Sequence, residues 1–327
     1  MSSFGRGPPV NKKIRVVIDE RTAEAKDVVR LVLRRPDGED LPAFTAGAHI
    51  DLFLPNGLTR QYSLINDSRE PDRYEIAVSK AAASRGGSSC VHARLNIGDV
   101  LEISEPRNNF SLQASHEAFH FIAGGIGITP ILSMIRYCES QGWQWRLLYL
   151  ARSRECAAFH NELEAFGTDR VRFHFDDEAG HLFDFADRSF MVAPGVPIYC
   201  CGPAPVMKAV GDFSSTHPDN PAYFEWFSPP AAAEANEAAG GFEVKLNRSG
   251  MLLRVPENKS ILEVLEEHGY ELSYSCREGM CRTCETSVIE GVPEHRDYVL
   301  SGSERAAGRT MMICVSRAKS PVLVLDI

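Results

Sequence analysis

The chain has 327 residues, 44% of them hydrophobic and 24% charged, and its net charge at pH 7 is −9. This length predicts two or three domains. The negative charge argues against a nucleic-acid partner, and no apolar run is long enough to cross a bilayer, so we expect no membrane partner either. The first nine residues lack the apolar core of a signal peptide, and nine cysteines without one favour a reducing compartment, so we expect a cytoplasmic protein.

The first segment of the chain alternates between apolar and polar residues with a period of two, as in residues 14–18, 28–33 and 74–78. Turn residues separate these runs. Short alternating strands with such punctuation predict an antiparallel β-barrel domain over residues 10–113.

The pattern changes near residue 117 to alternating strand-like and helical stretches. The strand-like runs are 119–123, 145–150, 171–175 and 196–201, and the helical stretches are 130–140, 157–166 and 204–213. This alternation predicts an α/β domain with a parallel sheet over residues 114–227.

A stretch rich in Pro, Ala, Glu and Gly, residues 228–241, is typical of an interdomain linker. Residues 242–327 form a third predicted domain. It begins with a hairpin of residues 242–246 and 252–255, and a helix follows at 260–268. Ser260 is the expected N-cap of this helix and Glu263 its capping-box partner.

Four cysteines near the C-terminus carry the strongest chemical signal. Cys276, Cys281 and Cys284 have the spacing C-x4-C-x2-C, and Cys314 follows after a long gap. This is the spacing of a plant-type [2Fe-2S] cluster, and Gly279 allows backbone N–H groups to approach the sulfurs. The alternatives are a structural zinc site, which favours C-x2-C pairs, of which only one is present here, and free core cysteines.

Other residues near the cluster and elsewhere have plainer interpretations. Arg277 and Arg282 lie on the expected rim of the cluster loop, where they would either dock an acidic partner or remain solvated charges. Four further cysteines have no partner spacing and are predicted to be buried as small apolar residues: Cys90, Cys138, Cys156 and Cys200.

The β-barrel segment contains a candidate flavin site. Arg60-Gln61-Tyr62-Ser63 ends a strand, and Gly86-Gly87-Ser88-Ser89 opens a helix. Glycines and serines at a helix start offer N–H groups and hydroxyls to an anion, and Arg60 is suited to bond a phosphate. Tyr62 offers a flat face to an isoalloxazine, and Ser63 a hydrogen bond to its N5. Taken singly, these pieces are also typical of an ordinary turn and strand end.

The α/β segment contains two candidate nicotinamide motifs. Residues 124–130, GGIGITP, follow a strand and open a helix, with Thr129 as expected N-cap and Pro130 at the first helical position. Cys201-Gly202-Pro203 ends another strand, where α/β sheets bind ligands. Cys201 would then lie near the nicotinamide, or it simply packs in the core. Arg152 and Asp176 follow two further strands and are candidate contacts of the adenosine. The acidic pair 176–177 favours NADH, and arginines 152 and 154 leave NADPH open.

The order of these motifs, RQYS, GGSS, GGIGITP, CGP and CREGMCRTC with a later Cys, resembles the phthalate dioxygenase reductase family. Vanillate demethylase reductase subunits are similar, and both belong to the ferredoxin-NADP+ reductase superfamily. The resemblance runs from about Lys13 to Ile327. It implies an FMN-binding β-barrel, a nicotinamide domain and a β-grasp ferredoxin domain, in that order.

The resemblance also implies which residues bind each cofactor. For FMN they are Arg60, Gln61, Tyr62, Ser63, Val78, Ser79, Lys80, Gly86, Gly87, Ser88, Ser89 and Thr129, with Phe227 stacking on or screening the flavin. For the nicotinamide nucleotide the candidates come from the motifs and strand ends themselves, and they are Gly124, Gly125, Gly127, Arg152, Asp176, Cys201, Gly202 and Pro203.

The function implied is an electron relay from NADH through FMN and the cluster to a terminal Rieske-type oxygenase, with Ser63 and Cys201 at the hydride-transfer point. The sequence shows no proton-transfer dyad, and the relay does not require one. Two alternatives stay open. One is a similar reductase for a diiron or haem monooxygenase, and the other is a non-catalytic iron–sulfur carrier or sensor.

Overall fold

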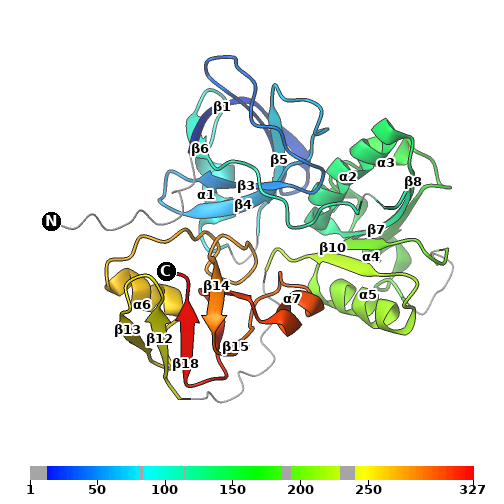
Figure 1. The fold of residues 1–327 in the computed structure, drawn as a ribbon. Coiled ribbons are helices and arrows are strands. Elements are labelled where there is room, and N and C mark those ends of the chain that lie inside the picture. The colour runs from blue at the N-terminus through cyan, green and yellow to red at the C-terminus, as the bar shows by residue number, and fades with distance from the viewer. Residues whose placement is uncertain (1–12, 82–83, 114, 186–192, 229–239) are drawn as a thin grey trace. The chain divides into compact units, whose positions relative to one another are not determined.

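The computed structural model describes residues 13–81, 84–113, 115–185, 193–228 and 240–327. These residues fall into two compact units, Lys13–Glu225 and Trp226–Ile327 (Figure 1). Most of the predicted linker 228–241 lies outside the described residues. Within the described ranges, every helix is too short or too polar to cross a bilayer.

The N-terminal part of the first unit is an antiparallel β-barrel with strand order β4-β3-β6-β1-β2-β5. Its elements are β1 (Ile14–Ala25), β2 (Val28–Arg34), β3 (His49–Phe53), β4 (Thr59–Ser63), β5 (Tyr74–Ser79), α1 (Gly87–Arg94) and β6 (Val100–Ile103). A bridge between Leu64 and Ile76 joins the two edge strands and closes the barrel. The alternating side chains fill its interior with residues such as Ile18, Leu31 and Ile50.

The rest of the first unit is a five-stranded parallel sheet with order β11-β10-β7-β8-β9. Its strands are β7 (Ala118–Gly124), β8 (Gln144–Ala151), β9 (Val171–Phe175), β10 (Ile198–Cys201) and β11 (Ala222–Glu225). The connections contain α2 (Ile128–Gln141), α3 (His160–Glu164), α4 (Asp176–Ala179) and α5 (Ala204–Thr216), with 3-10 turns η1 (Gly125–Gly127) and η2 (Arg154–Cys156). Figure 1 shows α2 and α5 on opposite faces of the sheet.

Two sequence predictions for the helices were wrong in detail. Helix α2 begins at Ile128, and Gly127 is its N-cap, so Thr129 and Pro130 lie inside the first turn. The hydroxyl of Thr129 donates to the carbonyl of Ile126 at 3.0 Å instead of capping the helix. The helix predicted for 157–166 is shortened to α3 because Phe159 has φ 60°, a left-handed conformation that no α-helix continues through.

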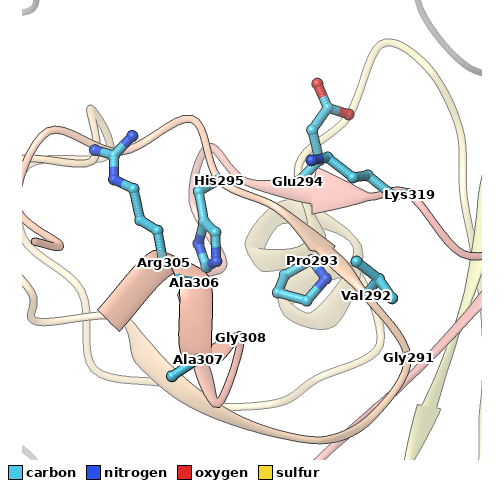
Figure 2. A pocket seen from close by; sticks show the side chains of 10 residues that line it. All are labelled: Gly291, Val292, Pro293, Glu294, His295, Arg305, Ala306, Ala307, Gly308 and Lys319. Atoms are coloured by element: carbon cyan, nitrogen blue, oxygen red, sulfur yellow. The ribbon is translucent and has the colours of Figure 1, made fainter. Parts of the chain in front are cut away.

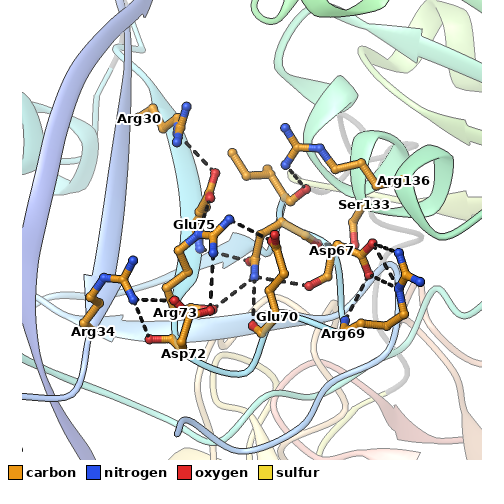
Figure 3. Close-up of polar contacts among 12 residues, drawn as sticks. Arg30, Arg34, Asp67, Arg69, Glu70, Asp72, Arg73, Glu75, Ser133 and Arg136 are labelled. Atoms are coloured by element: carbon orange, nitrogen blue, oxygen red, sulfur yellow. Dashed lines mark hydrogen bonds and ion pairs between the residues drawn. The ribbon is translucent and has the colours of Figure 1, made fainter. Parts of the chain in front are cut away.

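A polar network fastens the loop after β4 to helix α2 (Figure 3). Arg136 of α2 donates to the carbonyl of Ile65 at 2.8 Å, and Ser133 donates to the carbonyl of Asn66 at 3.3 Å. The side chain of Asn66 in turn bonds Arg73 and Glu75 of the loop and β5. The network therefore holds the end of β4 in a fixed position relative to the parallel sheet.

The second unit is an α+β fold with sheet order β13-β12-β18-β14-β16 and a separate β15-β17 pair. Its elements are β12 (Phe242–Leu246), β13 (Leu252–Val255), α6 (Ile261–Glu267), β14 (Glu285–Glu290), β15 (Pro293–Glu294), α7 (Gly302–Ala307), β16 (Thr310–Met312), β17 (Arg317–Ala318) and β18 (Val322–Leu325). The predicted hairpin is confirmed. So is the capping box, in which the Glu263 N–H donates to Ser260 Oγ at 3.1 Å.

Candidate functional site

The four C-terminal cysteines converge in the second unit. Cys276, Cys281 and Cys284 lie on the irregular loop before β14, and Cys314 follows β16. The thiol of Cys276 is a hydrogen-bonding neighbour of the thiols of Cys281 and Cys314, and Cys314 is a neighbour of Cys284. Residues from two distant segments thus present four sulfurs to one point, as a [2Fe-2S] cluster requires.

The loop also directs backbone donors at a sulfur. The N–H groups of Glu278 and Met280 both donate to Cys276 Sγ at 3.3 Å. Between them, Gly279 has φ 72°, and a Cβ there would lie 3.0 Å from the Cα of Asp297. The loop can follow this path only with a glycine at its centre. Such N–H donors stabilise an electron-rich thiolate and tune the potential of a bound cluster.

The four cysteines match the ligand set of a two-iron cluster. No three His, Cys, Asp or Glu side chains within the described ranges are arranged around a single metal ion. A [2Fe-2S] cluster asks only for two thiolates at each iron, which the four neighbouring cysteines supply.

Replacing Gly279 by Ala is expected to abolish cluster assembly, because the new methyl group would lie 2.7 Å from Cγ2 of Val315 and 3.0 Å from Cα of Asp297, and the alanine would have to adopt a positive φ. Gly269→Ala is the matched control, since Gly269 has φ 79° but open space around its Cα. We expect normal iron and sulfide content in the control and a loss of most of both in Gly279→Ala. Equal cluster content in the two variants would contradict the close approach.

The two arginines of the cluster loop are engaged within the unit. Arg277 pairs with Glu266 at 2.6 Å and lies over the ring of Tyr274. Arg282 donates to Glu304 at 2.8 Å. Burial raises the pKa of Glu304, but the hydrogen bonds from Arg282 and from Ser301 outweigh it and lower the pKa to about 2. Both guanidinium groups therefore brace the loop, and the docking role considered for them stays a prediction.

A buried His–Asp pair lies behind the cluster loop. His295 lines a pocket between the segment 291–295 and the end of α7 (Figure 2). Its Nδ1 lies 3.7 Å from Oδ1 of Asp297, whose other oxygen accepts the N–H groups of Val299 and Leu300. Because the backbone of Asp297 packs on Gly279, this pair supports the loop.

The residues predicted to bind the flavin phosphate lie together in the first unit. Helix α1 begins at Gly87, and a Cβ there would lie 2.5 Å from Nε of Arg60. The guanidinium group donates to the carbonyl of Arg85 at 2.9 Å and is held across the helix start. Ser84, which the sequence did not single out, accepts the Gly86 N–H at 3.2 Å and the Ser88 hydroxyl at 3.0 Å. The N–H groups and hydroxyls gathered at this helix start are donors of the kind that suit a phosphate.

The other predicted flavin residues lie around the same strand ends. Tyr62 packs against the barrel interior, and burial raises its pKa to about 12, so its hydroxyl stays protonated. Val78 and Ser79 end β5, and Lys80 follows them. Thr129 is buried in the first turn of α2. Their contacts with FMN stay predictions.

The two predicted nicotinamide motifs meet between β7 and β10, where the order in which the chain adds strands to the sheet reverses. Strands β7 and β10 are neighbours, and the chain leaves them toward opposite sides of the sheet. A Cβ on Gly127 would lie 2.2 Å from the carbonyl oxygen of Cys201, and one on Gly202 would lie 3.0 Å from Gly124. Open α/β sheets bind ligands at such a switch point, and bare glycines let a dinucleotide approach the backbone.

The remaining residues predicted to bind the nucleotide lie at the carboxyl ends of other strands of this sheet. Arg152 follows β8, and Asp176 follows β9. Cys201 is 1% exposed, and burial raises the pKa of its thiol, so it is a neutral side chain rather than a nucleophile.

Phe227 is 44% exposed and lies in the second unit, so its contact with a flavin stays a prediction. Three of the four unassigned cysteines are buried as predicted, but Cys156 is only partly buried.

The structure shows the surroundings of Glu225, an acid to which the sequence analysis gave no chemical role. Glu225 ends β11 beside Cys201, and the hydroxyl of Ser63 donates to its Oε2 at 3.5 Å. Burial raises the pKa of Glu225 to about 8, although the Ser63 hydrogen bond opposes this. Ser63 and Glu225 are 162 residues apart, so only the docking of the barrel on the sheet brings them together. They form a candidate proton-transfer pair where none was expected.

Replacing Glu225 by Gln is expected to remove a pH dependence of stability. The folded pKa of about 8 exceeds the ordinary value of 4.5. The folded protein therefore keeps a proton that the unfolded chain has released, and stability falls as pH rises from about 4.5 to about 8. The free energy of unfolding of Glu225→Gln, relative to that of the wild type, should therefore increase across this window by about 1.4 kcal/mol for each unit of the pKa shift. The measurement is the free energy of unfolding of both proteins against pH. A constant difference would contradict the buried acid.

The features of the two units define a class of protein: a reductase that uses a flavin and a nicotinamide nucleotide, joined to a ferredoxin domain. A family model described as a 2Fe-2S iron-sulfur cluster binding domain matches residues 244–319. Phenoxybenzoate dioxygenase subunit beta of Ectopseudomonas oleovorans is 43% identical over 100% of both chains. A solved phthalate dioxygenase reductase, described as a modular structure for electron transfer from pyridine nucleotides to [2Fe-2S], is 40% identical. It has a TM-score of 0.70 and covers 96% of this chain and 98% of its own.

The chain belongs to the phthalate dioxygenase reductase family, as its motifs indicated. The predicted fold classes are also confirmed. A self-sufficient cytochrome P450 monooxygenase matches as well, with 33% identity and a TM-score of 0.89, over 98% of this chain and 43% of that one.

Proposed function

We propose that this protein is the reductase component of a multicomponent oxygenase. It would take electrons from NADH, pass them through FMN to a [2Fe-2S] cluster, and deliver them to a terminal Rieske-type oxygenase. The observation that carries the proposal is the convergence of four cysteine thiols in a chain whose other unit offers a phosphate site and a dinucleotide switch point. A flavin, when bound, converts a hydride pair into single electrons for the cluster.

The protein's own groups would bind and orient the cofactors. Arg60 and the start of α1 would hold the FMN phosphate, and Tyr62 would lie beside the isoalloxazine. Cys276, Cys281, Cys284 and Cys314 would ligate the irons. We assign residues 10–113 to the flavin domain, 114–227 to the nicotinamide domain and 242–327 to the ferredoxin domain, with 228–241 as linker. Ser63 and Cys201 would border the hydride-transfer point.

NADH is the proposed donor rather than NADPH. Asp176 and Asp177 follow β9, where a 2′-phosphate would meet two carboxylates. Arg154 pairs with Glu178 at 3.2 Å and lies over the ring of Phe175, so its charge is already compensated. The negative charges of these two carboxylates would repel a 2′-phosphate, so this edge of the sheet favours a free ribose hydroxyl.

The acceptor is the least constrained part of the proposal. Relatives at 40–43% identity are named as a dioxygenase subunit and a dioxygenase reductase, which favours an oxygenase component as acceptor. We propose that this acceptor is of the Rieske type and that the protein works in the cytoplasm. A haem acceptor is the second candidate, because a cytochrome P450 monooxygenase contains a segment of the same fold at 33% identity.

The test is an anaerobic titration of the purified protein with NADH, followed by identification of the released flavin. We expect one FMN per chain and bleaching of both the flavin and the cluster absorbance. NADPH should require far higher concentrations. A cluster spectrum without flavin, or with no response to either nucleotide, would overturn the proposal in favour of an iron–sulfur carrier or sensor.

A further inference from the structure

A buried histidine faces the candidate proton-transfer pair. His49 begins β3 and is the register partner of Ser63 on β4, so the two side chains share one face of the barrel wall. Its side chain is buried, and within the described part of the chain its Nδ1 has no hydrogen-bond partner. Oε1 of Glu225 lies 4.0 Å from that nitrogen. A buried hydrogen-bond donor without a partner lowers the stability of the fold, so the presence of a histidine at this position needs an explanation.

A chain of polar groups fixes which nitrogen of His49 carries the proton. Arg107 donates to Oδ1 of Asp51 at 2.7 Å, which keeps that carboxylate an acceptor. Nε2 of Gln61 donates to the same oxygen at 3.2 Å, and this sets the direction of the amide. The second N–H of that amide faces Nε2 of His49 at 3.5 Å. Nε2 of the imidazole must therefore accept, and Nδ1 must hold the hydrogen.

The charges around His49 keep it neutral. Burial is the main cause that lowers its pKa to about 4; Arg107 lowers it further, and Asp51 opposes this. Glu225 is faced by the Ser63 hydroxyl from β4, by His49 from β3 and by the neutral thiol of Cys201 from β10. The Glu225 carboxyl group, with a pKa of about 8, is thus the member of this set that exchanges a proton closest to neutral pH.

The proposed relay needs such an acceptor. Oxidation of one NADH gives NAD+, two electrons and one proton. An iron–sulfur cluster takes the electrons singly and leaves the proton behind. A base whose pKa lies near the working pH is suited to receive that proton and release it again. The Glu225 carboxylate, bonded by the Ser63 hydroxyl, is placed to do this.

We propose that His49 is a positioning residue for Glu225. Its Nδ1–H donates to Oε1 of the carboxylate while the Ser63 hydroxyl donates to Oε2. The two hydrogen bonds stabilise the buried charge of Glu225 until the carboxylate takes up a proton. The required closure is about 1 Å, within what catalytic hydrogen bonds gain when ligands bind. This inference rests on the proposed function, because it assigns the proton released by NADH oxidation.

The direct test is the tautomer of His49, read by nitrogen NMR of the full chain with labelled histidine. The signal is assigned by its loss in His49→Asn. We expect a neutral ring with the hydrogen on Nδ1 that does not titrate between pH 5 and 8. A ring with the hydrogen on Nε2, or one that titrates near its ordinary pKa of about 6.5, would overturn the proposal. The measurement needs no flavin and no turnover.

A second test reads Glu225 itself, through its carboxyl stretch in infrared difference spectra against pH, assigned with Glu225→Gln. His49→Leu should raise the titration midpoint by about one to two pH units, the size of a lost charge-assisted hydrogen bond. His49→Asn should stay near the wild type, because an amide offers both a donor and an acceptor. Identical midpoints in all three proteins would overturn the positioning role. Absence of bound flavin would instead count against the proposed function and leave both tests readable.

Discussion

Cys314→Ser is expected to abolish the [2Fe-2S] spectrum while NADH still reduces the flavin. Cys314 lies beyond β16 and is the sulfur that joins Cys276 to Cys284 at the convergence point. A serine hydroxyl is a far weaker ligand than a thiolate because it stays protonated, so the second iron would lose one of its two protein ligands. Apart from Phe227, the predicted flavin residues lie in the other compact unit and should be unaffected.

The control for this variant is Cys156→Ser, which replaces a partly buried thiol outside the cluster loop. It should keep full iron content and full reduction of both centres. The measurements are the visible spectrum, the iron content and the rate of anaerobic flavin reduction. A normal cluster band in Cys314→Ser would mean that another residue is the fourth ligand.

Arg60→Ala is expected to weaken FMN binding by about tenfold to a hundredfold, the loss of one to two charge-assisted hydrogen bonds to the phosphate. The guanidinium group is already oriented for this by the carbonyl groups of Thr59 and Arg85, at 2.8 and 2.9 Å. A preoriented donor loses little conformational entropy when the phosphate arrives, and this increases its contribution.

Two further variants separate charge from geometry at this position. Arg60→Lys keeps the charge but not the planar fork, and it should bind FMN with intermediate affinity. Arg94→Ala, at the far end of α1, should leave the affinity unchanged. FMN dissociation constants and melting temperatures are measured together, because Arg60 also packs on Gly87. An unchanged dissociation constant in Arg60→Ala would refute the phosphate role.

The sequence revealed the parts of the site that depend on short spacing. Three cluster cysteines lie within nine residues, and the GGSS and GGIGITP segments each contain their own turn chemistry. The order of these motifs along the chain carried the domain architecture and the family. Local patterns also sufficed for most strands, since burial on one face imposes a period of two.

The sequence could not reveal groups that meet only through tertiary structure. His49, Ser63 and Glu225 come from three strands in two sheets, and no periodicity relates them. Ser84 was hidden because a serine before two glycines is typical of any turn. The late start of the helix predicted at 157–166 depends on Phe159, whose N–H donates to Glu24 at 3.1 Å. In each case a distant contact overrode the local preference.

Electron flow from NADH to the cluster through the flavin can be tested with protein from which the flavin alone has been removed. NADH is added anaerobically, and the cluster absorbance is followed before and after FMN is restored. We predict no cluster reduction without flavin and full reduction with it. Rapid reduction of the cluster by NADH in the flavin-free protein would contradict the account.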